Sequence, residues 1–223
     1  MNEVLLFSEI IIIFSLVVLS KKLFNKEGLL LWIGLASVLA NLEVSKSINV
    51  FGINATLGNV LFASVFLATD IITECYGKDE AKKGVKIGLF SMIVYLITTQ
   101  FAINFIPSEF DVVNESMINL FNIAPRICLS SVIMFYLSNV IDVYLYDKLL
   151  NKFKGNKMWL RNNMCTIFCN CLENFGFTIL AFYNIFPTNE IMSIAIATSV
   201  IEIIIALCDT PFLYIAKKLK NKK

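Results

Sequence analysis

The chain has 223 residues, of which 57% are hydrophobic and 16% charged, and its formal net charge at pH 7 is +2. A mean hydropathy of +0.74 is too apolar for a soluble domain of ordinary composition. The small net charge also argues against nucleic-acid binding. The composition therefore predicts a protein whose main solvent is the lipid bilayer.

Seven apolar stretches come near the roughly 20 residues that a helix needs to cross the hydrocarbon core. The first is followed by lysines and not preceded by them, which is the reverse of a secretory signal, so it is expected to be a retained anchor helix. An all-α integral membrane protein with seven spans is predicted. In chain order the spans are 4–20, 29–44, 55–73, 87–106, 127–146, 164–186 and 191–214.

Basic residues fall in alternate gaps between these stretches, and the other gaps are acidic. Because positive charge is retained on the cytoplasmic side of a membrane, this alternation predicts a multi-pass protein of the plasma membrane with its N-terminus outside and its C-terminus in the cytosol. The basic gaps hold Lys21, Lys22 and Lys26; Lys78, Lys82, Lys83 and Lys86; Lys148, Lys152, Lys154, Lys157 and Arg161; and the lysines of 217–223.

Carboxylates inside the spans are the strongest functional signal, because each costs about 2.5–3.5 kcal/mol at mid-bilayer. Asp70 and Glu173 are flanked by apolar residues on both sides and are expected in a functional polar site. Glu74, Asp142 and Asp209 either belong to that site or mark the ends of spans and pair with nearby lysines. Their predicted depths are similar, so the acids are expected to gather around one hollow.

Asp209 and two further charged residues, Glu202 and Arg126, are candidates for coupling or gating. Glu202 and Asp209 lie two turns apart on the last span. Arg126 begins the fifth span and is expected either to snorkel to the outer interface or to guard an entrance.

A short internal echo links the fifth and sixth spans. Ser138-Asn139-x-x-Asp142 and Cys169-Asn170-x-x-Glu173 each place a carboxamide and a carboxylate three residues apart, on one helix face. Two such faces can meet across a pseudo-twofold relation, as transporter sites often do at repeat interfaces, although chance explains so brief an echo equally well.

Missing motifs restrict the chemistry further. The chain has no histidine, no GxxxxGK[ST] phosphate loop, no HExxH and no CxxC, so no catalytic residue, metal or cofactor is predicted. The six cysteines are expected to serve helix packing. Gly84-x-x-x-Gly88 opens the fourth span and predicts close helix contact there.

The stretch from Phe51 to Gly84 resembles the signature of the queuosine precursor transporter family, also called the vitamin uptake transporter family. Its core is Thr69-Asp70 followed by Glu74-x-Tyr76-Gly77-Lys78. The later stretches 138–146, 159–177 and 209–212 resemble further blocks of that family. The resemblance runs from about residue 41 to 212. It implies a six-helix transporter core at 28–223, with residues 1–27 as an added N-terminal helix and basic loop.

The resemblance implies uptake of a 7-deazaguanine base, either queuine or its cyano and aminomethyl precursors. A buried carboxylate can accept the adjacent N–H donors of a guanine-like edge, carboxamides can bond its carbonyl and ring nitrogens, and aromatic rings can stack on it. Both blocks carry Asn where the family usually has Gln, which leaves the exact ligand open. The expected substrate-binding residues are Lys46, Phe66, Asp70, Glu74, Asn139, Asp142, Asn170 and Glu173.

Two other functions stay open at this stage. The size and helix number also suit the substrate-capture subunit of an energy-coupling-factor uptake system, which relies on a separate ATPase. A membrane-embedded enzyme using the Asp70 and Glu74 acids is a second alternative, with thin support. The partners expected are a small nucleobase and the lipid bilayer, while a homodimer or an energising partner is left undecided.

Overall fold

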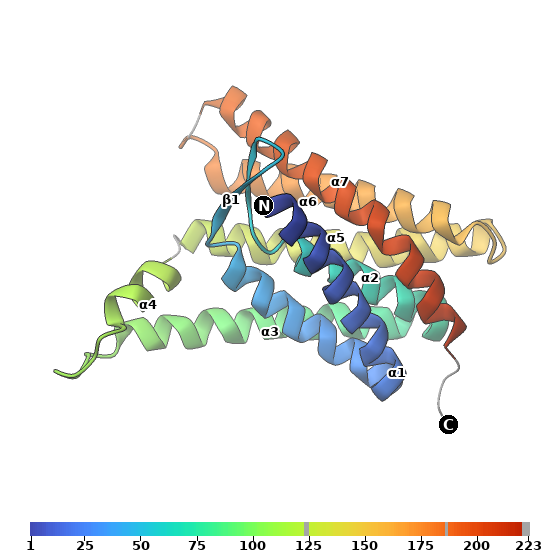
Figure 1. Cartoon of the computed structure of the whole chain (residues 1–223), viewed down its shortest axis with the longest axis horizontal. Coiled ribbons are helices and arrows are strands. Elements are labelled where there is room, and N and C mark those ends of the chain that lie inside the picture. The colour runs from blue at the N-terminus through green and yellow to red at the C-terminus, as the bar shows by residue number, and fades with distance from the viewer. Residues whose placement is uncertain (123–124, 186, 220–223) are drawn as a thin grey trace.

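The computed structural model describes residues 1–122, 125–185 and 187–219, without the side chains of 47, 53–56 and 125–128. Two predicted segments extend beyond the described residues. Residues 220–223 of the predicted basic segment 217–223 and residue 186, the last of the sixth predicted span, lie outside the description. Figure 1 shows helices lying side by side, with a small hairpin at one end. The elements are α1 (Asn2–Glu43), β1 (Ser47–Val50), β2 (Ile53–Thr56), α2 (Asn59–Tyr76), α3 (Lys78–Asn104), α4 (Asn114–Phe121), α5 (Pro125–Lys152), α6 (Met158–Phe182) and α7 (Thr188–Lys218).

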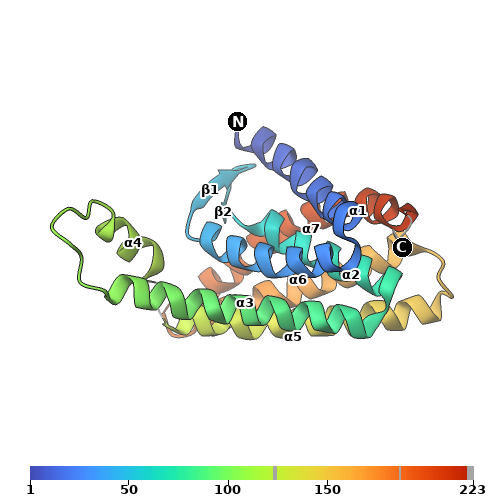
Figure 2. The ribbon, with the colours of Figure 1, turned by 90° about the horizontal axis from the view of Figure 1, so that it is seen from below.

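The first helix is sharply bent and returns on itself. Asn25 has φ 54° and ψ −133°, a non-helical conformation in the middle of α1. A straight helix of this length would be about 60 Å long. Instead, the side chain of Asn2 donates a 2.8 Å hydrogen bond to the carbonyl of Asn49, just beyond the other end of α1. The first two predicted stretches therefore form two arms of one bent helix, visible in Figure 2.

A two-stranded antiparallel hairpin follows α1, and sequence analysis did not predict it. Ser47 pairs with Thr56 and Val50 with Ile53. The turn residues Phe51 and Gly52 both have positive φ, 53° and 76°, as a tight hairpin turn requires. The backbone N–H of Phe51 donates to Glu3, so the hairpin also contacts the start of α1.

Within the described residues, six helices are long and apolar enough to cross a membrane: α1, α2, α3, α5 from Leu129, α6 and α7. The predicted helical membrane class is therefore confirmed. Helix α2 is central, since nearly all of its residues are buried and it packs against α1, α3, α5 and α7. Helix α3 lies at the periphery, with few buried residues and many large apolar side chains exposed.

Close packing at Gly84 and Gly88 confirms the prediction made from their spacing. A Cβ added at Gly84 would lie 2.6 Å from Ile33 of α1. At Gly88 it would lie 2.9 Å from the ring of Phe135 and 3.1 Å from Ile33 and Ser37. The two glycines therefore allow α3 to approach both α1 and α5.

We expect Gly88→Val to destabilise the folded protein, because its side chain must displace the ring of Phe135. Overpacking of this kind typically costs about 1–3 kcal/mol. Thermal unfolding in detergent measures the effect. Phe90→Leu, at a position of α3 that is 67% exposed, is the matched control and should leave the unfolding temperature nearly unchanged. Equal unfolding temperatures for the two variants would contradict the packing argument.

The helices define two ends of the molecule. The hairpin end, towards the left of Figure 1, holds β1, β2, α4 and the start of α7. The lysine end, towards the right, holds the bend of α1, the α2–α3 and α5–α6 connections and the end of α7. Ion pairs between helices gather at the lysine end, including Lys26 with Glu80 at 3.0 Å and Lys78 with Asp147 at 3.2 Å.

Candidate functional site

A cavity of about 360 Å³ lies among the helices at the hairpin half of the molecule. Its walls come from the end of α1, the start of α2, and parts of α3, α5, α6 and α7. This volume is within the range of about 300–1,000 Å³ typical of small-molecule sites. The lining residues are Asn41, Val44, Ser45, Asn59, Phe62, Ala63, Phe66, Tyr95, Leu96, Ser131, Met134, Asn170, Glu173, Asn174, Phe177, Thr178, Phe182, Ile194, Thr198 and Glu202.

Two carboxylates face the cavity, and each is held by a neighbouring side chain. The hydroxyl of Ser138 donates a 2.5 Å hydrogen bond to Oε2 of Glu173. The amide of Asn174 donates a 2.7 Å bond to Oε2 of Glu202. One oxygen of each carboxylate remains for a ligand, and Asn170 adds a nearly buried carboxamide to the same lining.

Aromatic rings form much of the remaining wall. Phe62 and Phe66 come from α2, Tyr95 from α3, and Phe177 and Phe182 from α6. Rings on several sides of a cavity suit a flat heterocycle, which can be held by offset stacking or edge contacts. The cavity thus combines acceptors for N–H groups with surfaces for a planar base.

Beneath the cavity lies a buried acid cluster, defined as Asp70, Asp142 and Asp209. All three side chains are fully buried. Asp70 of α2 and Asp142 of α5 are neighbours within this cluster. Asp209 accepts a 2.5 Å bond from the amide of Asn162 on α6. None of the three lines the cavity, so they form a separate polar site inside the helix bundle.

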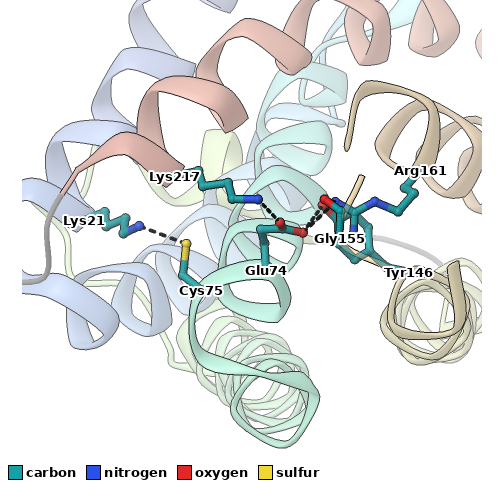
Figure 3. A network of polar contacts seen from close by, with 7 residues as sticks. All are labelled: Lys21, Glu74, Cys75, Tyr146, Gly155, Arg161 and Lys217. Atoms are coloured by element: carbon teal, nitrogen blue, oxygen red, sulfur yellow. Dashed lines mark hydrogen bonds and ion pairs between the residues drawn. The ribbon is translucent and has the colours of Figure 1, made fainter. Parts of the chain in front are cut away.

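A closing network, defined as Glu74, Tyr146, Arg161 and Lys217, joins four helices at the lysine end, as Figure 3 shows. Both carboxylate oxygens of Glu74 are used: Arg161 lies 3.0 Å from Oε2 and Lys217 2.5 Å from Oε1. The hydroxyl of Tyr146 donates to Oε2 at 3.2 Å, and the Arg161 guanidinium lies over the Tyr146 ring at 5.3 Å.

Cavity, buried acid cluster and closing network follow one another along the same helices. On α2 they are represented by Phe66, Asp70 and Glu74, one helical turn apart. On α7 they are represented by Glu202, Asp209 and Lys217. The cavity therefore extends towards the hairpin end, while side chains and ion pairs fill the path towards the lysine end.

The expected site residues are thus divided among several places and do not gather around one hollow. Of them, Phe66, Asn170, Glu173 and Glu202 line the cavity. Asn139 is buried on α5 with its amide bonded to the carbonyl of Phe135. Lys46 is exposed and is not part of the cavity lining. The side chain of Arg126 lies outside the described residues.

The two echoed segments do face each other. Ser138, the first residue of one, bonds Glu173, the acid of the other. The pseudo-twofold relation between the two segments stays a prediction, because this bond joins them in one direction only.

Sequence analysis missed several partners of the acids, among them Arg161, Asn162 and Ser138. Arg161 was assigned to a cytoplasmic loop as a topology signal, but it is fully buried and pairs with Glu74. Asn162 and Ser138 were not assigned to a site, and they bond Asp209 and Glu173. A polar residue at the edge of a span gives no local signal of which distant acid it will meet.

A helical membrane bundle that holds a largely apolar cavity with two carboxylates, and ion pairs at the opposite end, has the architecture of a membrane transporter. Residues 56–216 match the family described as "Putative vitamin uptake transporter". The chain belongs to this family, as the resemblance predicted.

Its relatives carry a more specific description. The chain is 37% identical over 210 residues to the "Probable queuosine precursor transporter" of Bacillus subtilis, covering 94% of this chain and 92% of that protein. It is 24% identical over 187 residues to the "Queuosine precursor transporter" of Escherichia coli, covering 80% of this chain and 81% of that one. No solved structure matches the chain.

Proposed function

We propose that this protein imports a queuosine precursor, a 7-deazaguanine base, into the cytoplasm through the cavity between α2, α5, α6 and α7. The observation that carries the proposal is the pairing of Glu173 and Glu202 with aromatic walls in one cavity. The family and the names of the relatives supply the substrate class.

The cavity chemistry suits each part of such a base. Glu173 is proposed to accept the adjacent N–H donors of the guanine-like edge, because a carboxylate can take two parallel hydrogen bonds. Asn170 bonds the ring carbonyl or a ring nitrogen. Phe66 and Phe177 hold the faces of the ring. Glu202, the second carboxylate of the lining, would receive the amine that queuine and the aminomethyl precursor carry.

Transport is proposed to follow alternating access, with the cavity open towards the hairpin end in the state described here. The lysine end is assigned to the cytoplasm by its basic residues, which puts the N-terminus outside and the C-terminus inside. This assignment requires each arm of α1 to cross the membrane, giving seven crossings. Residues 1–27 are then an added arm on a six-helix core at 28–223.

Uptake by the purified protein in proteoliposomes without ATP tests this function. We expect labelled cyano precursor, aminomethyl precursor or queuine to enter, with guanine as the competitor of related shape. A bound ligand also raises the unfolding temperature, since a ligand at 100 times its Kd stabilises the folded state by about 2.7 kcal/mol. Thermal shift across the four compounds ranks their affinities.

The same assay separates this function from the energy-coupling-factor alternative. A capture subunit would bind its ligand and raise the unfolding temperature, but would not move the ligand without its ATPase. Binding without uptake would therefore favour that alternative. Absence of both binding and uptake for all three 7-deazaguanine compounds would overturn the proposed function.

A further inference from the structure

The buried acid cluster has carboxyl oxygens without the donors that buried acids normally have. Both oxygens of Asp70, both of Asp142 and Oδ2 of Asp209 lack a hydrogen-bond donor among the described residues. The ion pairs in the described part of the chain include none with these three acids. An ionised carboxylate left this way in an apolar interior would be very costly.

Asp70 and Asp142 are fully buried neighbours, and no ion pair in the described part of the chain balances either one. Two like charges side by side in an apolar interior would repel strongly, so protonation of one of them stabilises the pair. An ionised carboxylate only accepts hydrogen bonds, whereas a protonated one can also donate to its neighbour. The pair is therefore suited to hold an exchangeable proton.

Other polar groups around the cluster are also unsatisfied, which indicates a site and not a single misplaced acid. Asn162 donates its amide to Asp209, while its own carbonyl oxygen has no partner among the described residues. One turn along α6, the buried hydroxyl of Thr166 is likewise unpaired within that part of the chain. These groups leave several unpaired polar atoms close together around the buried acids.

We propose that Asp70, Asp142 and Asp209 form a proton-binding site that couples substrate movement to proton entry. The inference rests on the proposed function, because it concerns how that transport is energised. A proton arriving from the cavity side would neutralise the pair while the closing network is intact. Opening of the lysine end would then expose the cluster to the cytoplasm and release the proton.

The position of the cluster supports this coupling. It lies between the cavity and the closing network along both α2 and α7, which puts it on the direct line between the two. Asp209 is two residues before Pro211, which interrupts the hydrogen bonds of α7 and makes bending there easier. The ionisable groups around the cluster are Glu74 from α2, Tyr146 from α5, Arg161, Cys165 and Cys169 from α6, and Cys208 from α7.

Proteoliposomes with the uncharged cyano precursor as the probe test the proposal. With the outside one pH unit more acidic, wild-type protein should concentrate the probe up to about tenfold for one proton per substrate, because a factor of ten corresponds to about 1.4 kcal/mol. Asp142→Asn should lose this concentration and retain exchange of labelled for unlabelled probe at equal pH. Asp147→Asn, on the same helix but in a surface pair with Lys78, is the control and should still concentrate the probe.

A pH dye trapped in the lumen gives a second measurement that needs no variant. Substrate-dependent acidification of the lumen by wild-type protein supports the proton site. Probe entry without any change of lumen pH overturns it, as does gradient-driven concentration by Asp142→Asn equal to wild type. If wild-type protein exchanges labelled for unlabelled probe but does not accumulate it under the pH gradient, the proton coupling is rejected and the proposed function stands. If wild-type protein does not exchange the probe at all, the coupling and the proposed function are both rejected.

Discussion

Glu173→Gln should reduce uptake of a 7-deazaguanine base by about 10- to 150-fold while leaving the protein folded. The substitution removes the charge that would receive the N–H edge of the base, and a hydrogen bond to a charged group contributes about 1.5–3 kcal/mol. Gln keeps the size of the side chain and can still accept the bond from Ser138. Initial rates in proteoliposomes, together with the thermal shift caused by the ligand, measure the effect.

Glu190→Gln is the matched control, because Glu190 is an exposed acid in the first turn of α7. It should transport like the wild type. A normal elution profile in detergent shows that either variant is folded. Wild-type uptake by a folded Glu173→Gln protein would remove Glu173 from the substrate site and leave Glu202 as the carboxylate of the cavity.

Arg161→Met should destabilise the protein by about 3 kcal/mol and open the lysine end. Breaking a buried ion pair typically costs about 3–5 kcal/mol, and the remaining partner Lys217 places the expected loss at the lower end of that range. Cys165 lies one turn from Arg161 on α6 and is fully buried. It should therefore react faster with a membrane-impermeant maleimide in the variant, as measured by mass spectrometry of its peptide.

Two further variants test the reason for this effect. Lys78→Met removes a partly exposed pair with Asp147, so it should change stability by less than about 1 kcal/mol and leave Cys165 protected. Glu74→Gln added to Arg161→Met should recover part of the lost stability, because it removes the buried charge that lost its partner. If Cys165 reacts at the wild-type rate in Arg161→Met, the network does not close this end.

Much of the architecture follows from local patterns in the sequence. Apolar length predicts helices, and the Gly84-x-x-x-Gly88 spacing predicts where α3 approaches its neighbours. The echo around Asp142 and Glu173 correctly points to the faces where α5 and α6 meet. In each case the signal lies within one or two helical turns, so periodicity is sufficient to read it.

Which acid lies in the cavity, in the buried acid cluster or in the closing network depends on packing between helices. No local pattern in the sequence reports that packing. Asp70 and Glu74 are one turn apart on α2, yet the first faces Asp142 and the second pairs with Arg161. Their different roles come from the residues that α5, α6 and α7 deliver opposite them, which are 70 or more positions away in the sequence. The bend at Asn25 is similar, because its non-helical backbone replaces what looked like an ordinary loop between two spans.

The return of α1 at its bend has a consequence for biogenesis. Lys21 is almost completely buried, and its ammonium group donates to the carbonyl of Ala216 at 2.7 Å and to the thiol of Cys75 at 3.1 Å. The first of these partners belongs to α7, which is synthesised long after the first arm of α1. Until α7 arrives, that arm carries an incompletely satisfied cation, and a chain truncated before α7 would expose it to lipid and to proteolytic quality control.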